Sequence, residues 1–267
     1  MILLRREAGL PRGLWTSDLV MKQFHFCNVF RCDDRVSAAV LSLSKKWQDP
    51  WRASLIGRLI NRYNTILELH NLEQPAKPEE MMSFIERFRL NTNAYRLPTP
   101  LGLNQAKGVV LMYEQGQGLG PEILAKEDVP SALKAMGNSV KFLGKFLGYQ
   151  VVLDLIELKA FGPSFRDDWA YPGPGCSRGA ARMMGIAIQG DWEIRDAISY
   201  KAEVTQEVMS QLLAASRDSL NWNPSWRPWT IHEVEGWLCE YDKWARRKNE
   251  ESAGGRKFKG PFGQNTA

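Results

Sequence analysis

The chain has 267 residues, 44% of them hydrophobic, and its 35 Lys and Arg residues against 30 Asp and Glu residues give a net charge of +5. This apolar content supports a folded core and excludes disorder over most of the chain, while the small positive excess permits a nucleic-acid partner without requiring one. The four cysteines contain no C-x-x-C pair, and no apolar run approaches the length of a bilayer. We therefore expect a soluble cytoplasmic protein with reduced thiols, no metal site held by its own residues and no membrane partner.

The first predicted helix lies in the stretch 26–37, which reads FCNVFRCDDRVS. It places Asn28, Arg31 and Arg35 at positions i, i+3 and i+7 of one helical face, with Asp34 one turn from Arg31. An amide and two guanidiniums on one face are suited to hold an anion or the edge of a base. An ordinary amphipathic helix with a surface ion pair between Arg31 and Asp34 explains the same spacing equally well.

A helical period dominates the rest of the chain, and no segment alternates convincingly as a strand. Apolar stripes predict helices within residues 51–67, 81–88, 204–212 and 234–244. Thr230 and Glu233 have the spacing of a capping box and open the last helix, which ends near Lys248. We predict an all-α fold with one helical domain over residues 1–248, followed by a basic, Gly-rich tail over residues 249–267.

A glycine-bounded turn between two predicted helices lies at residues 143–148, where Gly144 and Gly148 flank Lys145, Phe146 and Leu147. Such a turn exposes backbone N–H groups at the start of the second helix, where a phosphate can bind without any side chain. It resembles the helix-hairpin-helix of base-excision DNA glycosylases. A simple helix cap is the alternative, because any tight turn between helices favours glycine.

A second glycine-rich turn, at residues 172–179, enters a predicted helix. In the glycosylases, the turn at about this distance past the hairpin carries an aspartate that acts on the glycosidic carbon. Here Pro174 or Gly175 stands in that place. The resemblance implies a glycosylase-like scaffold that has lost the group that cleaves the base from its sugar. A helix cap is again the alternative.

The closing helix carries Glu235, Cys239 and Asp242 near one face and pairs Glu240 with Lys243. A helix packed against the core, with one charged side in solvent, explains most of this pattern. We expect Cys239 to be a small buried residue, because no histidine that could activate its thiol lies nearby in the sequence.

Several motifs occur in the order found in one known family. They are Phe26-Cys27-Asn28-Val29-Phe30-Arg31 with Asp34-Arg35-Val36-Ser37, Tyr149-Gln150 with Asp154-Leu155, Gly173-Pro174-Gly175 with Arg178-Gly179, and Glu235 with Leu238-Cys239-Glu240-Tyr241-Asp242-Lys243. Over roughly residues 18–248 the chain resembles the phage α-glutamyl/putrescinyl thymine pyrophosphorylases, or amino acid:DNA transferases, which are related to the helical domain attached to 5-hydroxymethyluracil DNA kinases. This sequence contains no kinase half, which favours the transferase branch.

The resemblance implies a helix-hairpin-helix, DNA glycosylase-like helical fold that acts on phage DNA in the infected bacterial cell. The implied reaction replaces pyrophosphate, on the 5-methylene carbon of pyrophosphorylated 5-hydroxymethyluracil, with the amine of a free amino acid or a polyamine, and yields hypermodified thymidine. Charge on the departing pyrophosphate needs cations, with Mg²⁺ as a possible helper. The residues that we expect to bind pyrophosphate or DNA are Asn28, Arg31, Arg35, Lys107, Gly144, Gly173, Gly175, Arg178 and Lys243.

The same chemistry requires a base and a stacking platform. The incoming ammonium must lose a proton, so we expect a catalytic carboxylate among Asp34, Asp154 and Glu240. The target pyrimidine must turn out of the duplex, and Phe26, Tyr149 or Trp169 is expected to stack on it.

Two other classes of function stay open at this point. A DNA glycosylase or other base-processing enzyme is favoured by the hairpin but disfavoured by Pro174 and Gly175. A non-catalytic helical module that binds DNA and assists a separate kinase is the third possibility, and release of pyrophosphate from modified DNA distinguishes it from the transferase.

Overall fold

The computed structural model describes residues 35–73, 77–87, 105–184, 202–217 and 229–248. Within these ranges the regular structure is helical, and the one sheet-like feature is an isolated bridge between Asp128 and Arg166. The prediction of an all-α fold is therefore confirmed for the part of the chain that the structure describes.

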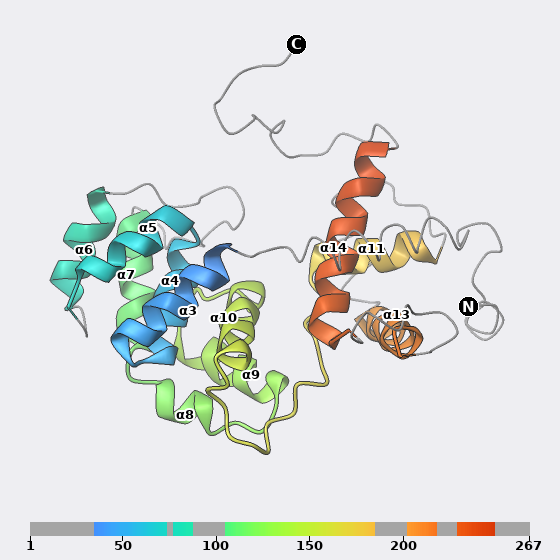
Figure 1. The fold of residues 1–267 in the computed structure, drawn as a ribbon, viewed down its shortest axis with the longest axis horizontal. Coiled ribbons are helices and arrows are strands. Elements are labelled where there is room, and N and C mark those ends of the chain that lie inside the picture. The colour runs from blue at the N-terminus through green and yellow to red at the C-terminus, as the bar shows by residue number, and fades with distance from the viewer. Residues whose placement is uncertain (1–34, 74–76, 88–104, 185–201, 218–228, 249–267) are drawn as a thin grey trace, which may run out of the picture. The chain divides into compact units, whose positions relative to one another are not determined.

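The chain divides into two compact units. The first, Met21–Tyr171, contains α3 (Arg35–Trp47), α4 (Pro50–Ile60), α5 (Tyr63–Glu68), η1 (Leu69–Asn71), α6 (Pro78–Arg87), α7 (Gln105–Gly116), α8 (Gly120–Leu124), α9 (Val129–Ser139) and α10 (Lys145–Glu157) (Figure 1). The second, Met1–Val20 with Pro172–Ala267, contains α11 (Pro174–Met183), α13 (Ala202–Ala215) and α14 (Ile231–Lys248). We refer to them as the α3–α10 unit and the α11–α14 unit. The helices of both units fall within residues 1–248, for which a single domain is predicted, and that domain boundary stays a prediction.

Helix α4 forms the centre of the α3–α10 unit, where it contacts α3, α5, α7 and α10. Asp49 caps its first turn by accepting a hydrogen bond of 3.0 Å from the backbone N–H of Arg52, and Pro50 occupies the first helical position. The helix ends at Asn61, which adopts a left-handed conformation with φ of 47°. The apolar stripe at residues 51–67 is therefore two helices, since the chain turns at Asn61 before α5 begins.

The predicted helical hairpin is formed by α9 and α10, which pack against each other. Asp128 caps α9 by accepting a 2.8 Å hydrogen bond from the backbone N–H of Ser131. The turn between the helices contains Phe142, which is 43% exposed and has a φ of 70°, and Gly144 is the N-cap of α10. The structure thus shows two helices in contact across a tight turn, while the helix-hairpin-helix motif and its role in binding phosphate stay predictions.

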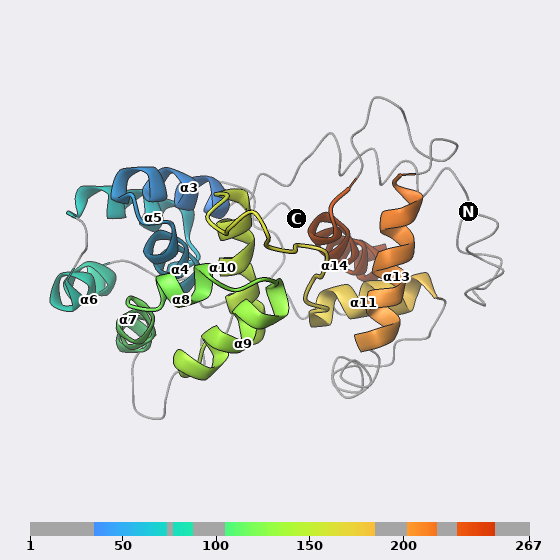
Figure 2. The same cartoon turned by 90° about the horizontal axis from the view of Figure 1, so that it is seen from below.

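In the α11–α14 unit, α11 lies against both α13 and α14 (Figures 1 and 2). The capping box that opens α14 is confirmed: Glu233 Oε2 accepts from Thr230 N at 2.8 Å, and Thr230 Oγ1 accepts from Glu233 N at 3.2 Å. The predicted tail at residues 249–267 lies outside the described residues.

Two glycines allow α11 to approach α14 closely. A Cβ atom added at Gly179 would lie 2.1 Å from the backbone oxygen of Leu238, and one added at Gly175 would lie 3.0 Å from Cys239 Sγ. Only a hydrogen atom fits at Gly179, because the neighbour is backbone and cannot move aside. The glycines of the predicted second turn thus set the spacing of two helices.

None of the helices described here combines the length and the apolar composition that a bilayer span requires.

Candidate functional site

Part of the predicted site lies outside the described residues. Phe26, Asn28, Arg31 and Asp34 belong to this group, so the anion-binding face proposed for them stays a prediction. Arg35 begins α3 and Lys243 lies on α14, but their side chains are not described.

Asp154 on α10 forms a buried ion pair with Arg58 on α4. Arg58 Nε and Nη2 each donate to one carboxylate oxygen at 2.6 Å, and Ser37 Oγ donates to Asp154 Oδ1 at 2.9 Å. The side chains of Arg58 and Asp154 are 3% and 0% exposed. This is the parallel, two-bonded arrangement in which a guanidinium matches a carboxylate best.

The predicted role of Asp154 as a general base conflicts with this geometry. Both of its oxygens already accept hydrogen bonds, and no solvent reaches them. Taking a proton from an amine would require opening this buried ion pair, which is strongly unfavourable. The arrangement favours a structural role in joining α3, α4 and α10. Arg58 itself was missed, although a single charge inside the apolar run of α4 was a visible signal.

Tyr149, the predicted stacking residue on α10, is fully buried. Its ring lies 6.1 Å from the ring of Tyr171. It therefore presents no face to a base, and Trp169, which is half-buried beside Tyr171, is the more accessible aromatic side chain. Of the other predictions in this unit, Lys107 on α7 and Gly144 at the start of α10 are both exposed.

The α11–α14 unit contains a cluster of arginines around one carboxylate. Asp242 on α14 is fully buried, and its Oδ2 and Oδ1 accept from Arg178 Nε at 2.8 Å and Arg182 Nε at 2.9 Å. Arg246 Nε lies 3.3 Å from Asp242 Oδ2. We call Arg178, Arg182, Arg246 and Asp242 the arginine cluster.

Sequence reasoning found Arg178 and missed the other two arginines of the cluster. Arg182 is one helical turn beyond Arg178, and Arg246 is one turn beyond Asp242, so each pair occupies one helix face. The sequence shows this spacing on each helix. It does not show that the two helix faces contact each other, because Arg178 and Asp242 are 64 positions apart.

Gly173 and Gly175, predicted to bind pyrophosphate or DNA, have packing roles here. Gly173 is the buried N-cap residue of α11, and Gly175 faces Cys239. Among the described predictions, Glu240 on α14 is an exposed carboxylate.

Two cysteines lie in the same helix interface. Cys239 Sγ donates to Glu235 Oε1 at 3.3 Å, and Cys176 is completely buried with its Sγ 3.6 Å from Met209 Sδ. Burial raises the pKa of the Cys176 thiol well above its usual range, and the electrostatic influence of Glu235 and Cys239 raises it further. Cys176 is therefore a neutral packing residue and a poor nucleophile.

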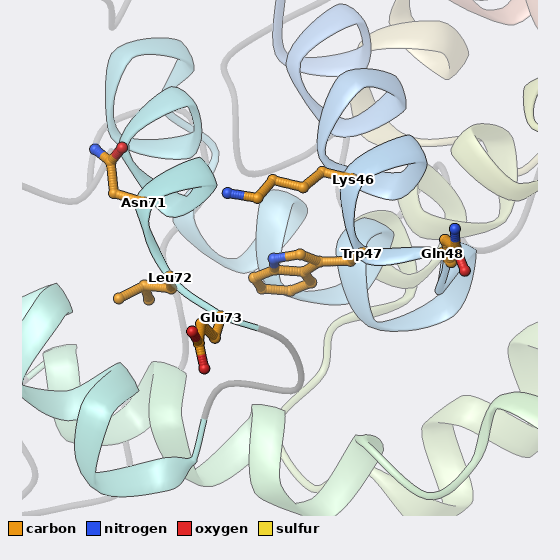
Figure 3. A pocket seen from close by; sticks show the side chains of 6 residues that line it. All are labelled: Lys46, Trp47, Gln48, Asn71, Leu72 and Glu73. Carbon is orange, nitrogen blue, oxygen red and sulfur yellow. The ribbon is translucent and has the colours of Figure 1, made fainter.

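A pocket of about 380 Å³ lies at the end of α3 and is distinct from both charged groups (Figure 3). Its lining residues are Lys46, Trp47, Gln48, Asn71, Leu72 and Glu73. Most of the polar ones are exposed, and none was predicted from the sequence. The pocket therefore does not point to a particular chemistry.

Within the described ranges, no group of three or more His, Cys, Asp or Glu side chains is arranged to hold a metal ion. The predicted help from Mg²⁺ stays a prediction.

A comparison with models of protein families identifies the family of this chain. The model described as "5-hmdU DNA kinase, helical domain" matches residues 1–254. The chain belongs to this family. No curated protein and no solved structure gives a match.

Membership of the 5-hmdU DNA kinase helical-domain family confirms the relation to the helical domain of 5-hydroxymethyluracil DNA kinases. It connects the chain to the modification of hydroxymethyluracil in DNA, and it makes DNA the expected partner. In that context the arginine cluster is the group of described residues best suited to contact phosphate, because guanidiniums match phosphate oxygens in pairs.

Proposed function

We propose that the protein is an amino acid:DNA transferase. It would displace pyrophosphate from 5-pyrophosphoryloxymethyl-uracil in phage DNA with the amine of an amino acid, or of a polyamine. The observation that carries this proposal is the family match over residues 1–254. The arginine cluster supports it, because displacement of pyrophosphate needs cations where negative charge develops.

The proposed step makes one bond and breaks one. The amine nitrogen forms a bond to the 5-methylene carbon, the bond from that carbon to the pyrophosphate oxygen breaks, and the electron pair leaves with pyrophosphate. The ammonium group of the amine must first give its proton to a base. Asp34 and Glu240 are the remaining candidates for that base, since Arg58 and Ser37 occupy Asp154.

DNA must be opened locally for this reaction. The 5-methylene carbon of a stacked pyrimidine is out of reach, so the base has to rotate out of the duplex. Phe26 and Trp169 are the proposed stacking residues, because Tyr149 is buried. The described residues contain no group of three or more His, Cys, Asp or Glu side chains arranged around a metal ion, and we propose that any Mg²⁺ would come with the pyrophosphate.

The test is direct. Purified full-length protein is incubated with duplex DNA that contains pyrophosphorylated 5-hydroxymethyluracil and with a pool of amino acids. We expect release of pyrophosphate and, by mass spectrometry of the nucleosides, a thymine that carries an amine-linked substituent. DNA with unphosphorylated 5-hydroxymethyluracil is the control and should give no product. Abasic sites would instead identify a glycosylase and overturn the proposal.

A second candidate follows from the same family match, because the matching model describes a domain of a kinase. The chain would then bind DNA and assist a separate 5-hydroxymethyluracil DNA kinase without chemistry of its own. DNA binding together with faster phosphorylation by such a kinase, and no release of pyrophosphate, would favour this function over the transferase.

A further inference from the structure

The arginine cluster holds more positive than negative charge. Three guanidiniums, from Arg178, Arg182 and Arg246, surround the single carboxylate of Asp242. Their side chains are 15%, 9% and 17% exposed, and Asp242 is 0% exposed. Arg178 and Arg246 alone bring two cations to this one carboxylate, which can balance only one of them, so positive charge remains in a mostly desolvated place.

Such an excess is costly unless an anion offsets it. Removing a cation from water is unfavourable, and the loss is recovered only by a well-placed counter-charge. Among the described residues, Arg178 and Arg246 contact no acceptor other than Asp242. Moreover, Arg246 Nε is buried and makes no hydrogen bond within the described structure, since its 3.3 Å approach to Asp242 lacks hydrogen-bond geometry. A purely structural bridge between α11 and α14 would need one arginine.

The geometry leaves donors available for a further ligand. Asp242 binds Arg178 and Arg182 through their Nε–H groups, which are on one edge of each guanidinium. The Nη groups of Arg178 therefore remain for another acceptor. Planar N–H forks of this kind match the paired oxygens of a phosphoryl group.

We infer that Arg178 and Arg246 form a binding site for one phosphoryl anion, and that Asp242 is the positioning residue that holds their guanidiniums in place. The inference rests on the proposed function, in which two sources supply this chemistry: the pyrophosphate leaving group and the phosphodiesters of DNA. Both present the same oxygens, and the experiment separates them.

Binding to the full-length protein is measured by calorimetry with inorganic pyrophosphate and by anisotropy with a short unmodified DNA duplex. We expect pyrophosphate to bind the wild type and to raise its thermal midpoint. Arg246→Gln should weaken binding by about tenfold or more, because it removes a charge-assisted contact. Arg87→Gln, at an exposed position of α6, removes the same charge elsewhere and should change affinity by less than about twofold.

Asp242→Asn tests the positioning role. The variant removes a negative charge next to the site, so a simple count of charges predicts tighter anion binding. We expect weaker binding, because the guanidiniums lose the acceptor that orients them. If this variant does not fold, Arg246→Lys is used in its place. Lysine keeps the positive charge but lacks the planar set of N–H donors of a guanidinium. The Arg246→Lys protein should therefore bind pyrophosphate more weakly than the wild type.

Each result assigns or overturns the site. Weaker pyrophosphate binding with unchanged DNA affinity identifies the leaving-group site, and the reverse identifies a backbone phosphate site. A folded Arg246→Gln protein that binds both ligands like the wild type would overturn the inference. If the wild type binds pyrophosphate through these arginines but releases none from modified DNA, the proposed transferase function fails while the anion site stands.

Discussion

Two buried aspartates show how the partners of a residue decide its role. Asp154 and Asp242 are both fully desolvated, and each accepts hydrogen bonds from guanidinium nitrogens. Both oxygens of Asp154 are occupied by the two-bonded pair with Arg58, whereas Arg178 and Arg246 share the single carboxylate of Asp242 with Arg182. A closed two-bonded pair stabilises the fold, and arginines that share one carboxylate are suited to receive an anion. The sequence indicated Asp154 as important but could not identify its partner, which lies 96 positions away.

Asp154→Asn should destabilise the protein more than it changes the chemistry. Removing one member of a buried ion pair leaves the other as an uncompensated charge, which costs about 3–5 kcal/mol. Asp168→Asn, at an exposed position, is the matched control and should change the free energy of unfolding by less than about 0.5 kcal/mol. Urea denaturation measures the free energy of unfolding of both variants. A stable Asp154→Asn protein whose activity is lost at neutral pH and restored at high pH would return Asp154 to the role of base.

The helices illustrate what local signals can specify. Caps depend on neighbouring residues, so the box at Thr230 and Glu233 was predicted from spacing and is confirmed. The left-handed Asn61 was missed, because the apolar period continues on both sides of it. The contact of α11 with α14 was also missed, since glycine in a turn and glycine in a close helix contact look alike in one sequence.

Gly179→Ala should weaken the α11–α14 unit. The added methyl group would lie 2.1 Å from the backbone oxygen of Leu238, so the helices must separate, at a cost of about 1–3 kcal/mol. Gly236→Ala is the control within the same pair of helices. Nothing lies within 4 Å of its added Cβ atom, and the change should stabilise α14 by up to about 1 kcal/mol. Thermal unfolding, monitored by circular dichroism, compares the two variants. Equal thermal midpoints for both would contradict the close packing of α11 against α14.

The cap of α9 should make stability depend on pH. Hydrogen bonds from Ser131, and to a smaller extent the Arg166 guanidinium, lower the pKa of Asp128 below its ordinary value. Because the folded-state pKa is the lower one, the contribution is complete above the unfolded pKa of about 3.9 and is lost as the pH falls through the folded-state value.

Asn caps a helix as well as Asp does, so Asp128→Asn isolates the loss of negative charge at the start of α9. It should cost up to about 1 kcal/mol of stability at neutral pH and almost none in strong acid, where both proteins lack the charge. Urea denaturation across this pH range measures the difference. A difference that does not shrink on acidification would mean that the charge of Asp128 does not contribute.

At the scale of the whole molecule, helical periodicity was sufficient to predict the class of fold. It was not sufficient to predict the division into two compact units, because that division depends on contacts between distant segments. The chain passes from one unit to the other at Tyr171 and Pro172, where the sequence shows only a Pro- and Gly-rich turn. The candidate site was also predicted only in part. Arg178 was predicted from its motif, but its contact with Asp242 and the participation of Arg182 and Arg246 were not.

DNA affinity should fall steeply with salt if the predicted basic tail binds phosphates. Replacing Arg256, Lys257 and Lys259 with Gln should make the slope of log K against log salt shallower, by about 0.9 for each phosphate that the variant no longer neutralises. The same substitutions at Lys45, Lys77 and Lys134, which are exposed lysines elsewhere, are the control for net charge. Anisotropy titrations at several salt concentrations measure the slopes, and equal slopes for the two triple variants would exclude the tail from the DNA interface.

The tight fit at Gly179 has a consequence for anyone who surveys this protein by saturation mutagenesis with activity as the readout. Gly179 follows Arg178 directly, and it fixes the distance across which the arginines of α11 reach Asp242 on α14. Most replacements there would pull the guanidiniums off their shared acceptor. The position would then score like a ligand-binding residue, although it has no side chain with which to bind anything.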